Sequence, residues 1–376
     1  MLTITDRYTA SLPYPYEKLG SPPGLLFFDI ETTGLSARTS QLYLIGSLFT
    51  DGTVFYLQQW FAQEPSDEKA VLAAFREELL TRPDGCLLLH FNGNGFDLPY
   101  LRKKYEHFSL PFPLDRFQSM DLYRSLRPFQ AVLGLASLRQ KAVETYLNLT
   151  RTDPLDGGQL IAVYENYLRT RSEADRKTLL LHNSEDVRNM PGLLAALKLG
   201  DYMEAHYSLT GQKYHTVTAL DGSEKVELLV TLCCPVALPR PISLRLDCGP
   251  YLTAAKNRIS LAVPLCEQTL KHYFSDTKNY FYLPDEDRAV HKSVGIYVDR
   301  DHRLRATKDN CYARKSGVFL PCPAGMKFQE KQASVFQRDR KEKTCYLEWN
   351  GEDSMKQTLT EEFWNAYVQA MWRSRR

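Results

Sequence analysis

Two acidic residues follow a short apolar run near the start of the chain. Asp29 and Glu31 come directly after residues 25–28 and are separated by Ile30. In a strand, alternate side chains lie on one face, so we expect the two carboxylates side by side and Ile30 on the opposite face. Two carboxylates this close repel each other unless a cation compensates them. The pair is therefore a candidate for half of a metal site.

The residues after this pair can also serve a functional site. Thr32, Thr33, Gly34 and Leu35 supply hydroxyl groups, backbone N–H groups and a glycine where a substrate backbone can come close. An Asp-x-Glu pattern alone is common in proteins. The complete run Asp-Ile-Glu-Thr-Thr-Gly-Leu behind an apolar strand favours a functional site over an accidental loop.

Another acid stands at a predicted helix start. Asp97 ends the segment Asn-Gly-Asn-Gly-Phe-Asp, which begins at Asn92 and follows the predicted strand 86–90. Taken alone, a glycine-rich turn with an acid in the first turn of a helix explains the segment, because the helix dipole favours that acid. Combined with Asp29 and Glu31, it indicates a third carboxylate of the same site.

A late helix carries the remaining candidates. His182 and Asp186 are four residues apart, which places them about 40° apart on one helix face. A His and an Asp so arranged can act as general base and metal ligand; the alternative is a helical His satisfied by its neighbouring acid. Glu185 lies near the same face as a rival ligand. Asp121, at the end of the last predicted strand, could assist or cap a helix.

These segments resemble the motifs of the DEDD exonuclease superfamily, whose catalytic domains have a ribonuclease-H-like fold. Residues 29–35 are similar to its first motif, 92–97 to its second and 182–186 to its third. Members with a catalytic His generally place it five residues before the Asp, whereas members with Tyr place it four before; here the His has the Tyr spacing. With Phe-Asn-Gly-x-x-Phe-Asp-x-Pro at 91–99, this resembles the YprB-type branch.

The resemblance covers roughly residues 22–198 and implies a two-metal mechanism. Two Mg²⁺ or Mn²⁺ ions lie about 3.5 to 4 Å apart in such sites. One ion, with His182 as general base, would generate the attacking hydroxide, and the other would stabilise the leaving 3' oxygen. The product would be a nucleoside 5'-monophosphate. The implied metal ligands are Asp29, Glu31, Asp97 and Asp186, and the implied substrate contacts are Thr32, Thr33, Gly34, Leu35 and Asn92.

The function expected from this resemblance is a metal-dependent 3'–5' exonuclease that hydrolyses phosphodiester bonds at single-stranded nucleic-acid ends. DNA is slightly favoured over RNA, although no motif announces readout of the 2'-OH. A catalytically silent nucleic-acid-binding scaffold of the same fold and a structure-specific endonuclease are the alternatives. A helicase or repair partner is compatible with such a domain, but no residue of the chain identifies one.

The length of 376 residues favours two domains. We expect an N-terminal extension at 1–21 and an α/β ribonuclease-H-like domain at 22–200, with a mixed sheet flanked by helices. A β-rich (α+β) C-terminal domain at 205–376 has no assigned role, substrate binding being one option. Strands are predicted at 25–28, 42–49, 54–61, 86–90 and 118–122, and helices at 67–80 (N-cap Ser66), 96–105, 137–147, 159–168, 173–190 and 360–372, with a new segment from Pro191.

Composition limits the possible partners. The net charge of +2 requires any nucleic-acid contact to come from a local basic patch, and residues 300–343 carry 12 Lys and Arg against 5 Asp and Glu. A solvated surface explains that stretch equally well. No run approaches the roughly 18 apolar residues of a membrane span, and the eight cysteines lack the paired short spacings of a zinc ribbon. We therefore expect a cytoplasmic protein that does not contact a membrane.

Overall fold

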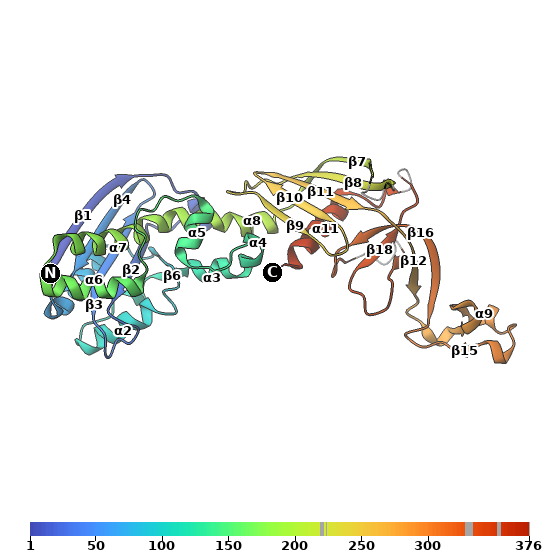
Figure 1. Ribbon diagram of the computed structural model, residues 1–376, viewed down its shortest axis with the longest axis horizontal. Coiled ribbons are helices and arrows are strands. Elements are labelled where there is room, and N and C mark those ends of the chain that lie inside the picture. Colours follow the sequence, from blue (N-terminus) through green and yellow to red (C-terminus); the bar gives the residue numbers. More distant parts are fainter. Residues whose placement is uncertain (219–221, 223, 328–333, 352–354, 376) are drawn as a thin grey trace. The chain divides into compact units, whose positions relative to one another are not determined.

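The chain forms two compact units, Met1–Leu199 and Gly200–Arg376, which are described separately. The computed structural model describes residues 1–218, 222, 224–327, 334–351 and 355–375. Figure 1 labels the helices and strands of both units. The predicted site residues all lie in the first unit, so the fold of that unit decides their arrangement.

The first unit is built on a six-stranded mixed sheet with the order β1-β4-β3-β2-β5-β6. The pairs β2–β5 and β5–β6 are parallel, and the other pairs are antiparallel. This confirms the expected strands. Their bounds are β1 (Leu2–Thr9), β2 (Leu25–Thr32), β3 (Leu42–Thr50), β4 (Val54–Phe61), β5 (Leu87–His90) and β6 (Gln118–Asp121).

β1 is a strand that sequence patterns did not indicate. It lies in the segment expected as an N-terminal extension and pairs with β4 along the edge of the sheet. Most of its residues are exposed or only half-buried, so it lacks the apolar alternation that marks a strand covered on one face. Its place in the sheet comes from backbone pairing with β4.

Helices cover both faces of this sheet. Phe28 packs towards Phe75 of α1 on one face, while Phe27 belongs to the core that Val187 of α7 completes on the other. Because Asp29 alternates with Phe28, its side chain lies on the α7 face. The helices of this unit are α1 (Glu68–Leu80), α2 (Asp97–His107), α3 (Leu122–Leu126), α4 (Gln130–Leu133), α5 (Gln140–Leu147), α6 (Gly157–Thr170) and α7 (Glu173–Leu193). The next helix, α8 (Lys198–Glu204), lies mostly in the second unit, where Tyr202 contacts Trp372.

Several predicted helix boundaries were wrong, among them the start of α5, which is Gln140 and not residue 137. Ser66 does not cap α1, because Pro65–Asp67 form a short 3-10 turn in which the Ser66 hydroxyl donates to Glu64. α7 does not end at Met190 but continues through Pro191 to Leu193. A proline lacks the backbone N–H, and in the last turn this removes one hydrogen bond without interrupting the ladder behind it.

The second unit is β-rich, as expected, and its described residues form three antiparallel sheets and a helix near the C-terminus. The helix α11 (Glu361–Arg373) buries Trp364, Tyr367 and Trp372. One sheet has the strand order β7 (Ser208–Thr218), β8 (Glu224–Cys233), β11 (Arg258–Pro264), β10 (Tyr251–Ala255) and β9 (Ile242–Arg245). Another has the order β12 (Cys266–Tyr273), β16 (Tyr312–Cys322), β18 (Cys345–Glu348) and β17 (Val335–Phe336). The smallest has the order β14 (Arg288–His291), β13 (Tyr280–Leu283) and β15 (Leu304–Arg305), and α9 (Lys292–Gly295) follows β14 in the chain.

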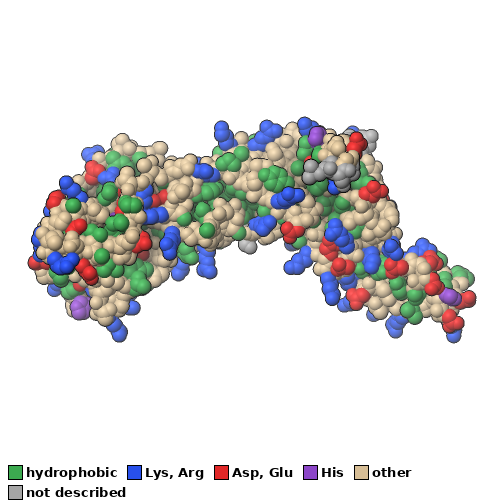
Figure 2. Space-filling view, in the orientation of Figure 1, with side chains coloured by type: hydrophobic (Ala, Val, Ile, Leu, Met, Phe, Trp, Pro, Cys, Tyr) green, Lys and Arg blue, Asp and Glu red, His purple; other side chains and the backbone are tan. Residues whose placement is uncertain are grey.

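The surface gives no single field of one charge on the face in view. Figure 2 shows Lys and Arg side chains interspersed with Asp and Glu on both units. In the basic stretch 300–343, Arg314 pairs with Asp287 and Lys315 with Glu348. Among the described residues, no helix combines the length and apolar character needed to cross a membrane.

Candidate active site

Asp29 and Glu31 lie at the C-terminal end of β2 on the face covered by α7. Glu31 is buried, and the β2–β3 register shifts between Glu31 and Thr32. Asp29 lies opposite Gly46 of β3. Because Gly46 has no side chain, Asn183 of α7 comes close to the sheet there, and its Nδ2 donates to Asp29 Oδ2 at 3.1 Å. The glycine and the asparagine together fix the position of the first carboxylate.

Asp97 reaches the same place from the start of α2. The turn before it is held by Asp121, whose carboxylate accepts from the backbone N–H groups of Asn92 and Asn94 at 3.0 and 3.3 Å. Asp121 also caps α3 by accepting from the N–H of Arg124. The structure therefore gives Asp121 a capping and turn-holding role, one of the two roles considered from the sequence.

α7 supplies the histidine and the fourth acid. His182 Nε2 lies 3.1 Å from Asp186 Oδ2 and 3.6 Å from Glu31 Oε1. His182 and Asp186 lie on one face of α7, as their spacing indicated. Glu185 faces elsewhere: its carboxylate accepts from the Thr152 hydroxyl and from the N–H groups of Thr152 and Asp153 at 2.6 to 2.9 Å. Glu185 anchors the segment before α6 and is not a ligand in this arrangement.

Three of the four acids, Asp29, Glu31 and Asp97, have raised pKa values, so their environment disfavours the charged carboxylate. Burial raises the pKa of Asp29 well above its usual range, and the charges of Asp186, Glu31 and Asp97 add to this. Burial raises the pKa of Glu31 to about 8 and that of Asp97 to about 7. Because the charge of Asp186 raises the pKa of Asp29, Glu31 and Asp97, the four acids form one electrostatic cluster.

Asp186 and His182 behave differently because they are paired with opposite charges. Burial alone would raise the pKa of Asp186, but hydrogen bonds and charges from His182 and Arg151 lower it overall. Burial opposes protonation of His182, yet the carboxylates of Asp186, Glu31 and Asp153 raise its pKa above the usual value. The site thus contains its own cations beside an excess of acids.

These residues fit divalent metal ions. One oxygen each from Glu31 and Asp186 and one ring nitrogen of His182 lie within 4.8 Å of one another. Burial, with the charges of neighbouring carboxylates, raises the pKa of Asp29, Glu31 and Asp97, and a bound cation would favour their charged forms. Carboxylate oxygens are the ligands that Mg²⁺ and Mn²⁺ prefer. The donor set therefore suits the ions expected from the sequence.

A second layer of this site comes from residues that sequence reasoning missed. Arg151 donates through one terminal nitrogen to Asp186 Oδ1 at 2.6 Å and approaches Glu144 at 3.2 Å. Asp153 Oδ2 lies 2.6 Å from His182 Nδ1. Both belong to the segment between α5 and α6, whose sequence shows no motif or periodicity. Only their contact with α7 identifies them.

The segment after Glu31 forms a tight, internally bonded loop. The Thr32 hydroxyl donates to Gly34 O at 2.9 Å, and the Thr33 hydroxyl accepts from the N–H of Gln41 at 2.9 Å. Both threonine side chains are thus used within the loop. Leu35 is 87% exposed at its tip. Of this segment, Leu35 presents the free side chain on which a ligand can pack.

A cavity of about 450 Å³ lies next to the acid cluster. Asn92, one of its walls, is hydrogen-bonded to Asp121, whose charge acts on Asp97. Gln140, another wall, donates to the backbone oxygen of Asp186 at 2.8 Å. The cavity is therefore joined to the backbone of Asp186 through Gln140, and none of the four acids lines it. Its lining residues are Phe91, Asn92, Tyr123, Leu138, Arg139 and Gln140.

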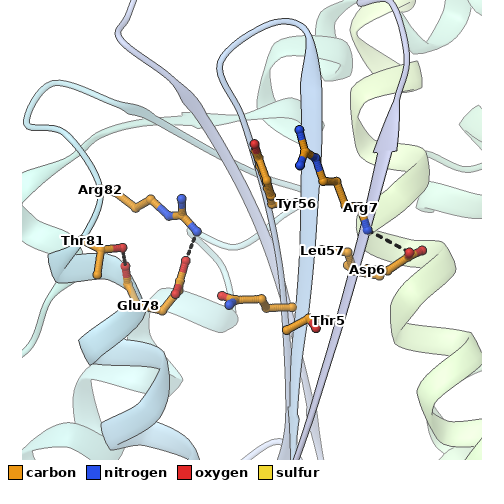
Figure 3. A pocket seen from close by; sticks show the side chains of 9 residues that line it. Thr5, Asp6, Arg7, Tyr56, Leu57, Glu78, Thr81 and Arg82 are labelled. Carbon is orange, nitrogen blue, oxygen red and sulfur yellow. Dashed lines mark hydrogen bonds and ion pairs between the residues drawn. The ribbon is translucent and has the colours of Figure 1, made fainter.

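Another cavity, of about 680 Å³, lies on the α1 side of β1 and β4 (Figure 3). Arg7 lies over the ring of Tyr56, and Arg82 pairs with Glu78 on α1. None of the predicted site residues lines this cavity. It is separate from the acid cluster, whose side chains lie on the α7 face.

Comparison with known proteins agrees with this architecture. A family model described as the RNase_H superfamily matches residues 26–198. No match was found among curated proteins. Similar solved structures include E. coli exonuclease I in complex with a dT13 oligonucleotide (15% identity, 56% of this chain and 55% of that chain covered, TM-score 0.31) and an ExoI/SSB-Ct complex (16%, 57% and 55%, 0.30).

These structural likenesses are limited in extent. The chain spans about half the length of the exonuclease I chains that it matches. At TM-scores near 0.3 they carry no conclusion about activity. The assignment of the fold rests on the family match together with the mixed sheet covered by helices on both faces. Residues 26–198 thus form a ribonuclease-H-like domain, the fold that the sequence motifs predicted.

Proposed function

We propose that the first unit is a metal-dependent 3'–5' exonuclease of the DEDD type, acting on single-stranded nucleic-acid ends. One observation carries this proposal: Asp29, Glu31, Asp97 and Asp186, from three distant segments, are gathered into one cluster, in which burial and the charge of Asp186 raise the pKa of the other three acids. Without a bound cation, grouping these carboxylates would lower the stability of the fold, because buried charges are costly unless they are paired or bind a metal.

In this proposal the four acids bind two Mg²⁺ or Mn²⁺ ions. Bound ions would lower the pKa of a water molecule and stabilise the charge on the leaving oxygen. The chain's own residues orient this chemistry. Asn183 holds Asp29, and Arg151 holds one oxygen of Asp186, leaving Oδ2 facing Glu31 and His182. His182 belongs to the proposed site through its Nε2.

The substrate is proposed to approach between the Leu35 loop and the adjoining cavity. Leu35 is free to pack on the terminal base. Phe91 and Tyr123, whose rings meet edge to face with centroids 6.1 Å apart, offer aromatic surface for a neighbouring base, and Arg139 is exposed for a phosphate. Stacking and cationic contacts of this kind bind single strands with little sequence preference.

Several finer features belong to the same proposal. The product is a nucleoside 5'-monophosphate, and single-stranded DNA is favoured slightly over RNA. The second unit contributes to substrate binding, and the location is cytoplasmic. A helicase or repair partner is compatible with this activity. The product and the substrate preference follow from the sequence resemblance, the location follows from composition, and no motif assigns the role of the second unit.

The proposal is tested with matched DNA and RNA oligonucleotides whose 3' end is free or blocked, in Mg²⁺ or Mn²⁺. We expect mononucleotides from the free 3' end and stalling at the blocked one. Asp29→Asn should reduce the rate at least 10³-fold while leaving the melting temperature unchanged or raised, since one acid of the cluster loses its charge. Retained hydrolysis by this variant would refute the mechanism.

Two other outcomes would favour the alternatives. Continued internal cutting of blocked strands would identify an endonuclease. Binding of a labelled single strand without release of mononucleotides would identify a silent scaffold. The second alternative has one observation in its favour, because Arg151 and His182 already contact both oxygens of Asp186.

A further inference from the structure

The nitrogen of His182 that faces the site lies between two acids. Its Nε2 is 3.1 Å from Asp186 Oδ2 and 3.6 Å from Glu31 Oε1, and the three ligand atoms lie within 4.8 Å of one another. Two neighbouring ligands of one octahedral ion, with bonds of about 2.1 Å, lie about 3.0 Å apart. The separation of Nε2 from Oδ2 matches that value.

Asp153 determines which ring nitrogen of His182 is available. Its Oδ2 lies 2.6 Å from Nδ1, and its side chain is 1% exposed. Lys141 and Arg151 lie 3.1 and 3.3 Å from the same carboxylate, so it is held as an anion that accepts hydrogen bonds. An anion at Nδ1 keeps a proton on that nitrogen. A metal ion that displaces the proton of Nε2 would therefore find the lone pair of the neutral ring on Nε2.

This arrangement is that of a metal-binding histidine. Histidines that bind metals almost always donate their other ring N–H to a carboxylate or carbonyl, which fixes the ring's tautomer and orientation. The site has all three parts arranged in space: Asp153 at Nδ1, the ring of His182, and the carboxylates of Glu31 and Asp186 beside Nε2.

We propose that His182 is a ligand, through Nε2, of one of the two metal ions, together with Glu31 and Asp186, and that this ion position prefers Mn²⁺ or Zn²⁺ to Mg²⁺. The inference rests on the proposed metal site but changes the role that the sequence assigned to His182. Imidazole nitrogen favours first-row transition ions, whereas Mg²⁺ is bound best by oxygen ligands alone.

The position of the ring distinguishes a ligand from a general base. A general base must face the water molecule that it deprotonates. His182 is only 5% exposed, and its Nε2 faces the two carboxylate oxygens. Arg151 occupies Oδ1 of Asp186 at 2.6 Å, so the oxygen left for an ion is the one beside Nε2. Four-residue spacing on α7 produces this placement, because it stacks the two side chains directly.

The experiment measures binding of Mn²⁺ to the full chain by electron paramagnetic resonance and calorimetry, without substrate. Spin-echo modulation from an imidazole nitrogen is expected for the wild type and is expected to disappear in His182→Gln. Mn²⁺ affinity should fall at least 10-fold in His182→Gln, and 10- to 100-fold in Asp153→Asn. Mg²⁺ affinity should change less in His182→Gln. His107→Gln, at an exposed position of α2, is the matched control and should match the wild type.

A ligand swap keeps the test decisive if His182→Gln folds poorly. In His182→Asp the preference should move from Mn²⁺ towards Mg²⁺, because an oxygen ligand replaces nitrogen. Absence of nitrogen modulation in the wild type, or unchanged Mn²⁺ affinity in both His182 variants, would overturn the assignment. Nitrogen modulation in a wild type that releases no nucleotide would support the ligand assignment and remove the proposed exonuclease function. Hydrolysis by a wild type without nitrogen modulation would support the exonuclease function and overturn the ligand assignment.

Discussion

At the scale of single residues, the pKa of each acid in the site depends on whether a cationic side chain contacts it. Asp186 is contacted by Arg151 and His182, and its pKa is lowered. Asp29 and Asp97 have no such contact among the described interactions, and burial raises the pKa of each. Glu31 is intermediate: the charges of His182 and Arg151 lower its pKa, but burial has the larger effect and its pKa is raised overall. The pH dependence of stability follows from this difference.

Glu31→Gln should flatten the pH dependence of the first unit's stability in EDTA. The pKa of Glu31 is raised from 4.5 to about 8, so between these values the folded state binds a proton that the unfolded state has lost. Wild-type stability therefore falls as pH rises from 5 to 8.5. The variant should match the wild type at pH 5 and exceed it by about 1–3 kcal/mol at pH 8.5.

Urea unfolding at the two pH values measures this effect. Glu106→Gln, at an exposed position of α2, should keep the wild-type slope. Saturating Mn²⁺ should remove most of the slope from the wild type, because a bound cation replaces the protons. An identical pH dependence in the wild type and Glu31→Gln would contradict the assignment.

Arg151→Met should destabilise the first unit strongly. The Arg151 side chain is 9% exposed and contacts Asp186, Glu144 and Asp153. Its removal takes the cation from buried Glu144 and one of the two cationic partners from Asp186, which costs about 3–5 kcal/mol. The matched change Arg124→Met removes a 66% exposed arginine and should cost less than about 0.5 kcal/mol. Equal melting temperatures for the two variants would show that Arg151 is dispensable.

At the scale of elements, the site depends on how closely α7 approaches the sheet. The contact is at Gly46 of β3, where a Cβ atom would lie 2.1 Å from Asn183 Oδ1 and 2.9 Å from Val187 Cγ2. Asn183 is itself the residue that holds Asp29. The packing of one helix on one strand therefore sets the distance between the acids of β2 and those of α7.

Gly46→Ala should move α7 away from β3 and separate the two halves of the site. Overpacking of this kind costs about 1–3 kcal/mol of stability. We also expect Mn²⁺ affinity to fall, because Glu31 and Asp186 no longer meet. Gly157→Ala, where a Cβ meets nothing within 4 Å, is the control and should keep both properties. Calorimetry reports both, and unchanged Mn²⁺ binding in Gly46→Ala would argue against this coupling.

At the scale of the whole molecule, the acid cluster lies entirely in Met1–Leu199, and Gly200–Arg376 has its own core. In the second unit, α11 inserts Trp364, Tyr367 and Trp372, and Trp364 Nε1 donates to Gln212 of β7 at 2.7 Å. Each unit thus has its own buried interior. The metal site should be insensitive to damage in the second unit.

Trp364→Ala should test this independence. Its side chain is fully buried, so truncation should cost the second unit about 3–5 kcal/mol. Scanning calorimetry should show one transition lowered and the other unchanged, with Mn²⁺ affinity as in the wild type. If the second unit binds substrate, affinity for long single strands should fall while cleavage of short ones persists. Loss of Mn²⁺ binding would show that the units depend on each other.

The features that could be predicted from the sequence are those with local causes. The alternation of Asp29 and Glu31 around Ile30 is a property of any strand, and the stacking of His182 over Asp186 is a property of any helix. Apolar runs of suitable length placed the strands of the sheet, and motif resemblance named the ribonuclease-H-like fold that the family match supports. Such local rules suffice to identify candidate ligands before their contacts are known.

Tertiary structure alone decided how those candidates are used. Arg151 and Asp153 carry no local pattern. Arg151 contacts Asp186, 35 positions further along the chain, and Asp153 contacts His182, 29 positions further along. The role of Glu185 in anchoring Thr152, like the pairing of β1 with β4, also depends on residues distant in sequence. Periodicity fixes the face on which a side chain lies, but its partner is chosen by packing between segments. That is why the sequence could name His182, whereas only the fold placed Asp153 behind it.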